Sequence, residues 1–155
     1  MKTLIVMVGL PGSGKSTYAK KTLLDLHPDW EYVSRDEVRY EYVTDQEHYF
    51  DHESEVYKEF INRLEMHLLN EKTVIADATH ISIGSRRKLI YNLKVKPDKI
   101  IAVVMMTPFE VSMERNAARE GITRAPDDLM YRMKNRYQKP NPHIEPFDQV
   151  VYIKQ

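Results

Sequence analysis

The sequence predicts one three-layer α/β domain, in which helices cover both faces of a five-stranded parallel sheet. Two observations lead to this prediction. Short apolar segments alternate along the chain with longer segments of helical character, as in parallel sheets whose strands are joined by helices. The first apolar segment, residues 4–8, leads directly into a glycine-rich loop and then a helical segment. The 155 residues, 42% of them hydrophobic, suffice for a single domain over residues 1–155.

The glycine-rich loop at residues 9–16 reads Gly-x-x-x-x-Gly-Lys-Ser, the spacing of the phosphate-binding loop. Glycines let the backbone adopt positive φ and approach a ligand closely, and the exposed N–H groups then bind anionic oxygens. Lys15 is expected to reach the β- and γ-phosphates of a nucleotide, and the Ser16 hydroxyl to bind Mg²⁺. The predicted nucleotide-binding residues of this segment are Gly9, Gly12, Ser13, Gly14, Lys15, Ser16 and Thr17. The loop does not reveal which group receives the phosphate.

The first part of the chain contains two predicted strands and two predicted helices. Residues 4–8 form an apolar run that suits a strand buried on both faces. Residues 16–26 carry apolar side chains for one face of a helix, and residues 27–29, His-Pro-Asp, end it. A short strand is predicted at residues 30–33. The helix over residues 34–42 begins with an acidic turn, as the helix dipole favours.

The middle of the chain continues the alternation. A longer helix is predicted at residues 47–70, where four apolar residues recur at every fourth position. Residues 72–76 are predicted as the third strand, and Ser82 can cap a helix that runs to residue 93. Residues 99–105 form the most apolar of the predicted strands.

The last third of the chain is predicted to hold a helical lid at about residues 115–137. Pro108 suits the first turn of a helix that runs to about residue 119. Gly121 interrupts it as a possible hinge, a further helix covers residues 127–137, and the last strand covers residues 147–153. Three arginines surround the interruption: Arg115, Arg119 and Arg124. Arginines on a lid neutralise charge that develops during phosphoryl transfer, although ordinary surface arginines on a helix are the alternative.

Two aspartates follow strands whose carboxyl ends should lie beside the phosphate-binding loop. Asp36 could accept a proton from an attacking hydroxyl, or it could simply cap its helix. Arg39 lies one turn later and could bind an acceptor phosphate, or pair with Asp36 or Glu41. Asp77 ends the third strand, where an aspartate can hold the coordination shell of Mg²⁺ through water, although a turn residue is the alternative.

Composition limits the classes of partner. The 23 basic and 23 acidic residues balance, which argues against binding to long nucleic acids by bulk electrostatics. The chain has no cysteine, so it has neither a disulfide framework nor a cysteine metal site. Residues 1–10 are too short to cross a membrane and do not resemble a signal peptide, so we expect a cytoplasmic protein without a membrane partner. The oligomeric state is not predicted.

The motifs together resemble those of P-loop kinases of the polynucleotide 5′-hydroxyl kinase type, including the kinase domains of phage and bacterial end-healing enzymes. The resemblance covers almost the full length and rests on the loop at residues 9–16, Ser-Arg-Asp-Glu-Val-Arg at 34–39, Val-Ile-Ala-Asp-Ala-Thr at 74–79, Arg86, Arg115, Asn116, Arg119, Arg124 and Pro126. His80, for which a surface loop is the expected position, stands where asparagine is common in that family. The implied fold is a parallel-sheet kinase core.

The resemblance also implies residue roles. Asp36 is expected to be the general base towards a 5′-hydroxyl, and Arg39 to bind the 3′-phosphate of the terminal nucleotide. Arg119 and Arg124 are expected to clamp the phosphates of ATP, with Arg115 also at the nucleotide. The remaining expected substrate contacts are Thr79 and Arg86.

We therefore predict a kinase that requires ATP and Mg²⁺ and phosphorylates the 5′-hydroxyl end of DNA or RNA. The predicted catalytic residues are Lys15, Asp36, Arg119 and Arg124. The same machinery could instead phosphorylate a hydroxyl of a small metabolite or an antibiotic. A nucleotide-dependent switch is a third alternative, but it would have no use for a base at Asp36.

Overall fold

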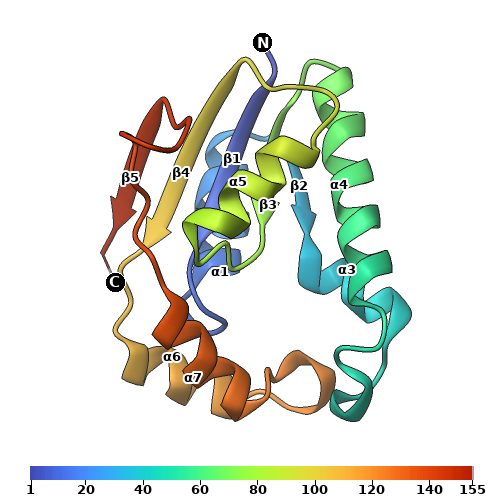
Figure 1. Cartoon of the computed structure of the whole chain (residues 1–155), viewed down its shortest axis with the longest axis vertical. Coiled ribbons are helices and arrows are strands. Elements are labelled where there is room, and N and C mark those ends of the chain that lie inside the picture. The colour runs from blue at the N-terminus through green and yellow to red at the C-terminus, as the bar shows by residue number, and fades with distance from the viewer. Residues whose placement is uncertain (155) are drawn as a thin grey trace.

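The central sheet has five strands, all parallel, in the order β2-β3-β1-β4-β5 (Figure 1). This computed structural model describes residues 1–154. The strands are β1 (Thr3–Val8), β2 (Glu31–Ser34), β3 (Thr73–Asp77), β4 (Lys99–Met105) and β5 (Gln149–Ile153). Their order places β1, and the loop that follows it, in the middle of the carboxyl edge of the sheet. The predicted fold, a five-stranded parallel sheet between helices, is confirmed.

Both faces of the sheet are buried, which explains the unbroken apolar runs of its strands. Alternate residues of β1 point to opposite faces. Leu4, Val6 and Val8 belong to a core that includes side chains of α4 (Glu53–Leu69) and α5 (Ile83–Asn92). Ile5 and Met7 belong to the core on the other face.

The helix after the phosphate-binding loop forms the cover of that second face. It consists of α1 (Lys15–Tyr18), a π-helical stretch (Ala19–Leu23) and α2 (Leu24–Leu26), which follow one another without a break. Together they match the predicted helix at residues 16–26. Ala19 is buried in the core that Ile5 and Met7 line.

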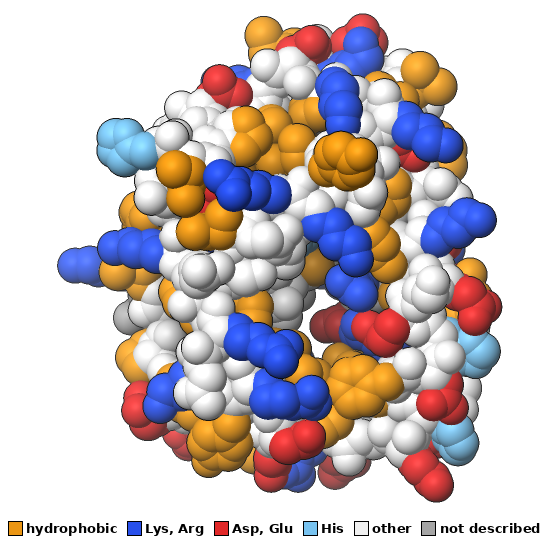
Figure 2. All heavy atoms as spheres, viewed as in Figure 1, with side chains coloured by type: hydrophobic (Ala, Val, Ile, Leu, Met, Phe, Trp, Pro, Cys, Tyr) orange, Lys and Arg blue, Asp and Glu red, His pale blue; other side chains and the backbone are white. Residues whose placement is uncertain are grey.

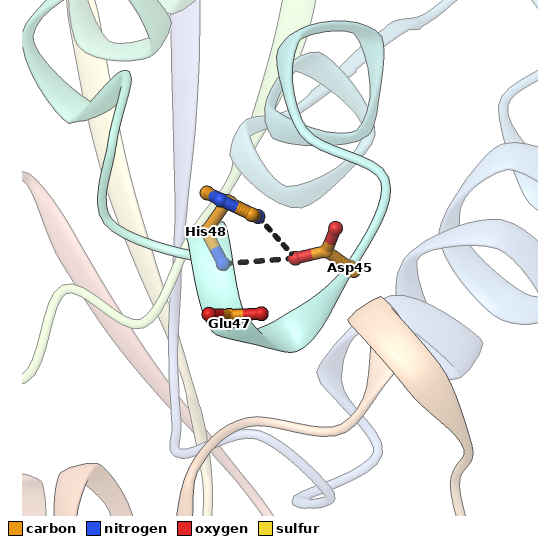
Figure 3. Close-up of side chains that lie close together, drawn as sticks. All are labelled: Asp45, Glu47 and His48. Carbon is orange, nitrogen blue, oxygen red and sulfur yellow. Dashed lines mark hydrogen bonds and ion pairs between the residues drawn. The ribbon is translucent and has the colours of Figure 1, made fainter.

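The predicted start of the long helix at residue 47 is wrong. A short 3-10 turn (Gln46–His48) comes first, and α4 begins only at Glu53. The Asp45 carboxylate caps this turn by accepting a hydrogen bond from the His48 backbone N–H at 2.9 Å, and it also contacts His48 Nδ1 at 2.6 Å (Figure 3). The chain then folds Tyr49 into the interior. A cap and a buried aromatic side chain here overrule the helical periodicity.

The predicted lid lies along the carboxyl edge of the sheet, where it closes a ring with the segment that follows α3 (Arg35–Tyr42) (Figure 1). It consists of α6 (Phe109–Ala117), a 3-10 turn (Gly121–Thr123) and α7 (Asp127–Arg136). The buried Asn116 ties α6 to the segment just before α7, because its side-chain amide bonds both the N–H and the carbonyl of Ala125, at 3.0 and 2.8 Å. Gln46 Nε2 donates to the carbonyl of Arg124 at 2.8 Å and so links the two sides of the ring.

The predicted hinge residue combines a left-handed backbone conformation with open space beside it. Gly121 has a φ of +60°, and apart from its chain neighbours no described residue lies within 4 Å of the position of an added Cβ. Among the described residues, no helix combines the length and apolar character that crossing a bilayer requires.

Candidate active site

The phosphate-binding loop has the backbone conformation that its glycines permit. Gly12 and Gly14 both have positive φ, at 84° and 89°. A Cβ at Gly12 would overlap the carbonyl oxygen of Ser112 in α6, so glycine is required here for packing as well as for conformation. The N–H of Gly9 donates to the carbonyl of Thr79 at 3.0 Å. This bond ties the loop to the segment that follows β3.

A cavity of about 380 Å³ lies between the loop and the lid. The residues that line it are Gly12, Gly14, Thr17, Tyr18, Lys21, Thr22, Arg115 and Arg119. Arg115 Nη1 also approaches the carbonyl of Gly12 at 3.4 Å. The structure thus brings three of the predicted loop residues, Gly12, Gly14 and Thr17, to one cavity with two of the three predicted lid arginines, whereas Lys15 is buried and does not line it. We refer to this space as the donor cavity.

Arg124, the third predicted lid arginine, lies elsewhere. Its Nη2 pairs with Asp127 Oδ1 at 3.1 Å, within the first turn of α7. It is not among the residues that line the donor cavity.

Asp77 and Ser16 lie together at the start of the helix after the loop. Ser16 Oγ donates to Asp77 Oδ2 at 2.6 Å, and the Tyr32 hydroxyl donates to the same oxygen. Burial and the neighbouring Asp77 charge raise the pKa of Tyr32, so its hydroxyl stays protonated and can only donate here. Sequence reasoning missed Tyr32, whose place within a strand gave no signal of this contact.

The second carboxylate oxygen of Asp77 is buried and has no hydrogen-bond partner among the described residues. A buried carboxylate oxygen without a partner is costly unless a cation or water compensates it. A hydroxyl beside this carboxylate also offers the oxygen ligands that Mg²⁺ prefers. The residues present therefore fit a hydrated Mg²⁺ at Ser16 and Asp77.

Asp36 lies in the first turn of α3 and pairs with Arg39 one turn later. Arg39 also forms two hydrogen bonds to Glu53, Nε to Oε2 at 2.7 Å and Nη2 to Oε1 at 2.8 Å, and its guanidinium lies over the Tyr49 ring. Burial alone would lower the pKa of Arg39, but the bonds to Glu53 and the Asp36 charge raise it, so the side chain stays charged. Sequence reasoning missed Glu53, because a continuous helix from residue 47 gave it no special position.

A cavity of about 350 Å³ opens beside Asp36, and we call it the acceptor cavity. Its wall comes from the phosphate-binding loop, α3, the start of α4, the segment after β3, and α7. Thr79 is one of its lining residues. Four arginines line it, Arg35, Arg39, Arg132 and Arg136, against two carboxylates, Asp36 and Glu53. Figure 2 shows a hollow in this face of the molecule, with Lys and Arg side chains gathered around it.

Arg86 does not fit the predicted role of a substrate contact. Its side chain has no exposed surface and pairs with Glu145, Nε to Oε1, at 2.7 Å. Its other nitrogens donate to the carbonyls of His80 and Gln138 at 2.7 and 2.9 Å. A fully buried guanidinium with these partners holds the chain segments of residues 80, 138 and 145 together, and in this arrangement it cannot contact a substrate.

The predicted surface position of His80 is also wrong. His80 is buried, and its Nδ1 lies 2.8 Å from the carbonyl oxygen of Met7. Burial lowers the pKa of His80 to about 4, so the ring is neutral at physiological pH. Its φ of 45° is one that asparagine also tolerates.

Comparison with known proteins identifies the family. A scan of protein families matches the AAA domain family over residues 4–140. The chain belongs to the AAA domain family. A search of curated proteins finds no match.

Solved structures resemble this domain over most of its length. Kti12 of Chaetomium thermophilum, solved with ADP-AlF3, is 19% identical, with a TM-score of 0.74 over 97% of this chain and 88% of that one. A chain of the Pnkp1/Rnl/Hen1 complex is 29% identical, with a TM-score of 0.63 over 73% of this chain. A fungal RNA kinase is 18% identical, with a TM-score of 0.70 over 99% of this chain. The matched part of this domain spans only 38% of each of the last two chains.

The family and the phosphate-binding loop identify a P-loop nucleotide-binding domain, and solved kinases share its fold. The resemblance to polynucleotide kinases holds at the level of family and fold. Sugar kinases, among them a gluconokinase, also match almost all of this chain. These neighbours act on different acceptors, so the proposed acceptor must be argued from the geometry of this site.

Proposed function

We propose that the protein transfers the γ-phosphate of ATP to the 5′-hydroxyl of a DNA or RNA end. The observation that carries this proposal is the charge of the acceptor cavity. Four arginines line this cavity, but only two carboxylates do, Asp36 itself and Glu53. Both carboxylates pair with Arg39. Such a cavity favours an acceptor that carries a phosphate close to its reactive hydroxyl over a neutral sugar.

Each side of the site has its part in the transfer. The loop amides and Lys15 hold the β- and γ-phosphates of ATP, while Arg115 and Arg119 approach from the lid. Mg²⁺, held by Ser16 and through water by Asp77, would offset charge on the phosphate oxygens. Asp36 accepts the proton of the acceptor hydroxyl as its oxygen bonds to the γ-phosphorus. The bond from that phosphorus to the β-γ bridging oxygen breaks, and ADP leaves with the electron pair.

Arg39 positions the Asp36 carboxylate and takes no part in proton or phosphoryl transfer itself. Its two bonds to Glu53 fix the guanidinium, and its contact with Asp36 fixes the carboxylate that serves as the base. The resemblance to end-healing kinases assigns the 3′-phosphate of the terminal nucleotide to this arginine, and its place on the wall of the acceptor cavity supports that role.

Transfer of labelled γ-phosphate to a panel of acceptors tests the proposal. The panel contains a 5′-hydroxyl oligodeoxynucleotide, the matching oligoribonucleotide, a nucleoside 3′-monophosphate, gluconate and water. We expect label on the nucleic acids and the nucleoside 3′-monophosphate, and none in Lys15→Ala. Label on gluconate alone would replace this proposal with a sugar-acid kinase. Release of phosphate to water, with no labelled acceptor, would instead indicate a nucleotide-dependent switch.

Asp36→Asn tests the base. The variant keeps the size of the side chain but cannot take up the proton, so kcat should fall by about 10²–10⁴-fold. The Kd for ATP should stay within a few-fold of wild type, because Asp36 lies in the acceptor cavity and not in the donor cavity. Glu37→Gln is the matched control, since Glu37 pairs with Lys20 at 3.1 Å instead. Wild-type turnover in Asp36→Asn would remove Asp36 from the mechanism.

A further inference from the structure

A further cavity, of about 410 Å³, adjoins the acceptor cavity, and we call it the second cavity of the acceptor side. The two share one wall, formed by Arg35, Glu53, Ala78, Thr79 and Ile81. The second cavity extends away from the lid, between α4 and α5, and none of the described residues of α6 or α7 lines it. An acceptor that places its hydroxyl at Asp36 could therefore continue into this space without meeting the lid.

Two cations meet at one aromatic ring in the second cavity. Arg35, from α3, lies 5.1 Å from the centre of the Tyr57 ring, and Lys88, from α5, lies 4.8 Å from it. Glu53 pairs with Arg35 at 3.4 Å, but it also bonds Arg39 at shorter distances. Two like charges near one ring repel each other, and an anion bound in the cavity that both residues line would offset that repulsion.

Arg35 has a donor without an acceptor. Its Nε is buried and has no hydrogen-bond partner among the described residues. Burial also lowers the pKa of Arg35, against the opposing effect of the Glu53 carboxylate, so a further anionic partner would favour its charged form. A phosphate oxygen is the kind of acceptor that a guanidinium in this state lacks.

The cavity also offers an acceptor suited to a nucleoside. Because the carbonyl of Met7 can only accept, His80 Nδ1 must carry the ring proton, which leaves Nε2 as an acceptor. His80 lines the second cavity together with Ser54. These groups can bond a sugar hydroxyl or a base amino group, which an inorganic anion does not have.

We propose that the second cavity binds the nucleotide that follows the 5′-terminal one, with the phosphate on its 3′ side between Arg35 and Lys88. This inference rests on the proposed function and deepens it, because it makes the natural acceptor an oligonucleotide rather than a mononucleotide. Arg35 directly precedes Asp36 in the chain, so the phosphate contact and the base lie in neighbouring parts of one continuous groove.

Short acceptors of defined length test the inference. We compare kcat/KM for a nucleoside 3′-monophosphate, a 5′-hydroxyl dinucleotide without a terminal phosphate, and the same dinucleotide with a 3′-phosphate. The second phosphate should raise kcat/KM at least about tenfold, the effect of one charge-assisted contact. The gain should shrink as salt is raised, because Lys88 is exposed.

Lys88→Ala should remove most of the gain from the second phosphate and change the mononucleotide rate several-fold less. Lys88→Arg should restore the gain. Lys72→Ala is the matched control, because Lys72 is an exposed lysine before β3, at the opposite edge of the sheet, and should change neither rate. All of these side chains are exposed, so the variants should fold.

Three outcomes can be told apart. Labelling of none of the nucleotide acceptors would end the proposed function itself. Equal rates for all three acceptors in the wild-type protein would keep the end-kinase function and overturn the second site. A gain that survives in Lys88→Ala, or a loss that is equal for the mononucleotide and the dinucleotide, would also overturn the role of the second cavity.

Discussion

The donor and acceptor sides of this site lie on one edge of one sheet, but they are built differently. The donor side depends on backbone: residues 9–17 are consecutive, and Gly12 and Gly14 take positive φ so that N–H groups can face a phosphate. The acceptor side depends on side chains that five separate segments bring to one cavity. A change in the acceptor could therefore evolve by substitution on α3, α4, α7 or the segment after β3 while the phosphate-binding loop stays intact.

Two aspartates show the same difference at the level of single residues. Asp77 is 2% exposed and meets the hydroxyls of Ser16 and Tyr32, and within residues 1–154 its other oxygen has no partner. The side chain of Asp36 is 38% exposed and meets a guanidinium. Both lie at or just after the carboxyl end of a strand, so sequence position does not separate them. Their surroundings suit the first to a hydrated cation and the second to a proton from an acceptor in the open cavity.

The largest further effect is expected on stability, from the buried ion pair of Arg86 and Glu145. Arg86→Met leaves Glu145 buried and without its partner, which should lower the free energy of unfolding by about 3–5 kcal/mol in urea titrations. Arg87→Met is the control, because Arg87 is exposed and bonds only the carbonyl of Ile144 in the described structure. Unchanged stability with a raised KM for the acceptor would instead return Arg86 to the substrate contacts that the sequence predicts.

A somewhat smaller effect should appear in the pH dependence of stability. The pKa of His80 is about 4 in the folded state, below the ordinary value of 6.5. Between these two pH values the unfolded chain binds a proton at His80 and the folded chain does not. The part of the free energy of unfolding that depends on neutral His80 is fully present above pH 6.5. It is lost as the pH falls from 6.5 to 4, by about 3 kcal/mol in all.

His80→Asn isolates that contribution. Asparagine tolerates the positive φ and can donate to the Met7 carbonyl, but it does not titrate. The variant should therefore lose less stability than wild type between pH 6.5 and 4, as measured by urea unfolding at each pH. Parallel curves for the two proteins would mean that His80 titrates normally in the folded state.

The smallest of these effects concerns the donor side. Asp77→Asn keeps the shape of the side chain but removes the charge that would hold a hydrated Mg²⁺. The Mg²⁺ concentration for half-maximal activity should rise about 10–100-fold, with little change in the KM of the acceptor. Tyr32→Phe, which removes one donor to the same carboxylate, should have a smaller effect. An acceptor KM that rises as much as the Mg²⁺ requirement would show that the two sides are not independent.

Much of the fold follows from sequence reasoning because it depends on local pattern. The strands and most helices lie close to their predicted positions, since apolar runs and helix signals such as Ser82 are local. The long helix begins six residues later than predicted, because the Asp45 cap and the burial of Tyr49 are tertiary matters. The positions of Arg86 and His80 differ from prediction for a related reason: a polar residue on a helix or in a loop can face either solvent or the interior, and only distant partners such as Glu145 and Met7 decide which.

By itself the sequence determined the phosphate-binding loop, the parallel sheet and the two aspartates at its carboxyl edge. These depend on neighbouring residues, whose spacing sets backbone conformation and burial directly. Only the tertiary structure decided that Glu53 holds Arg39, that Arg132 and Arg136 line the same cavity as Asp36, and that Arg35 and Lys88 meet at Tyr57. Those contacts join residues far apart in the chain, and their geometry is set by how the helices pack on the sheet, which no local pattern encodes.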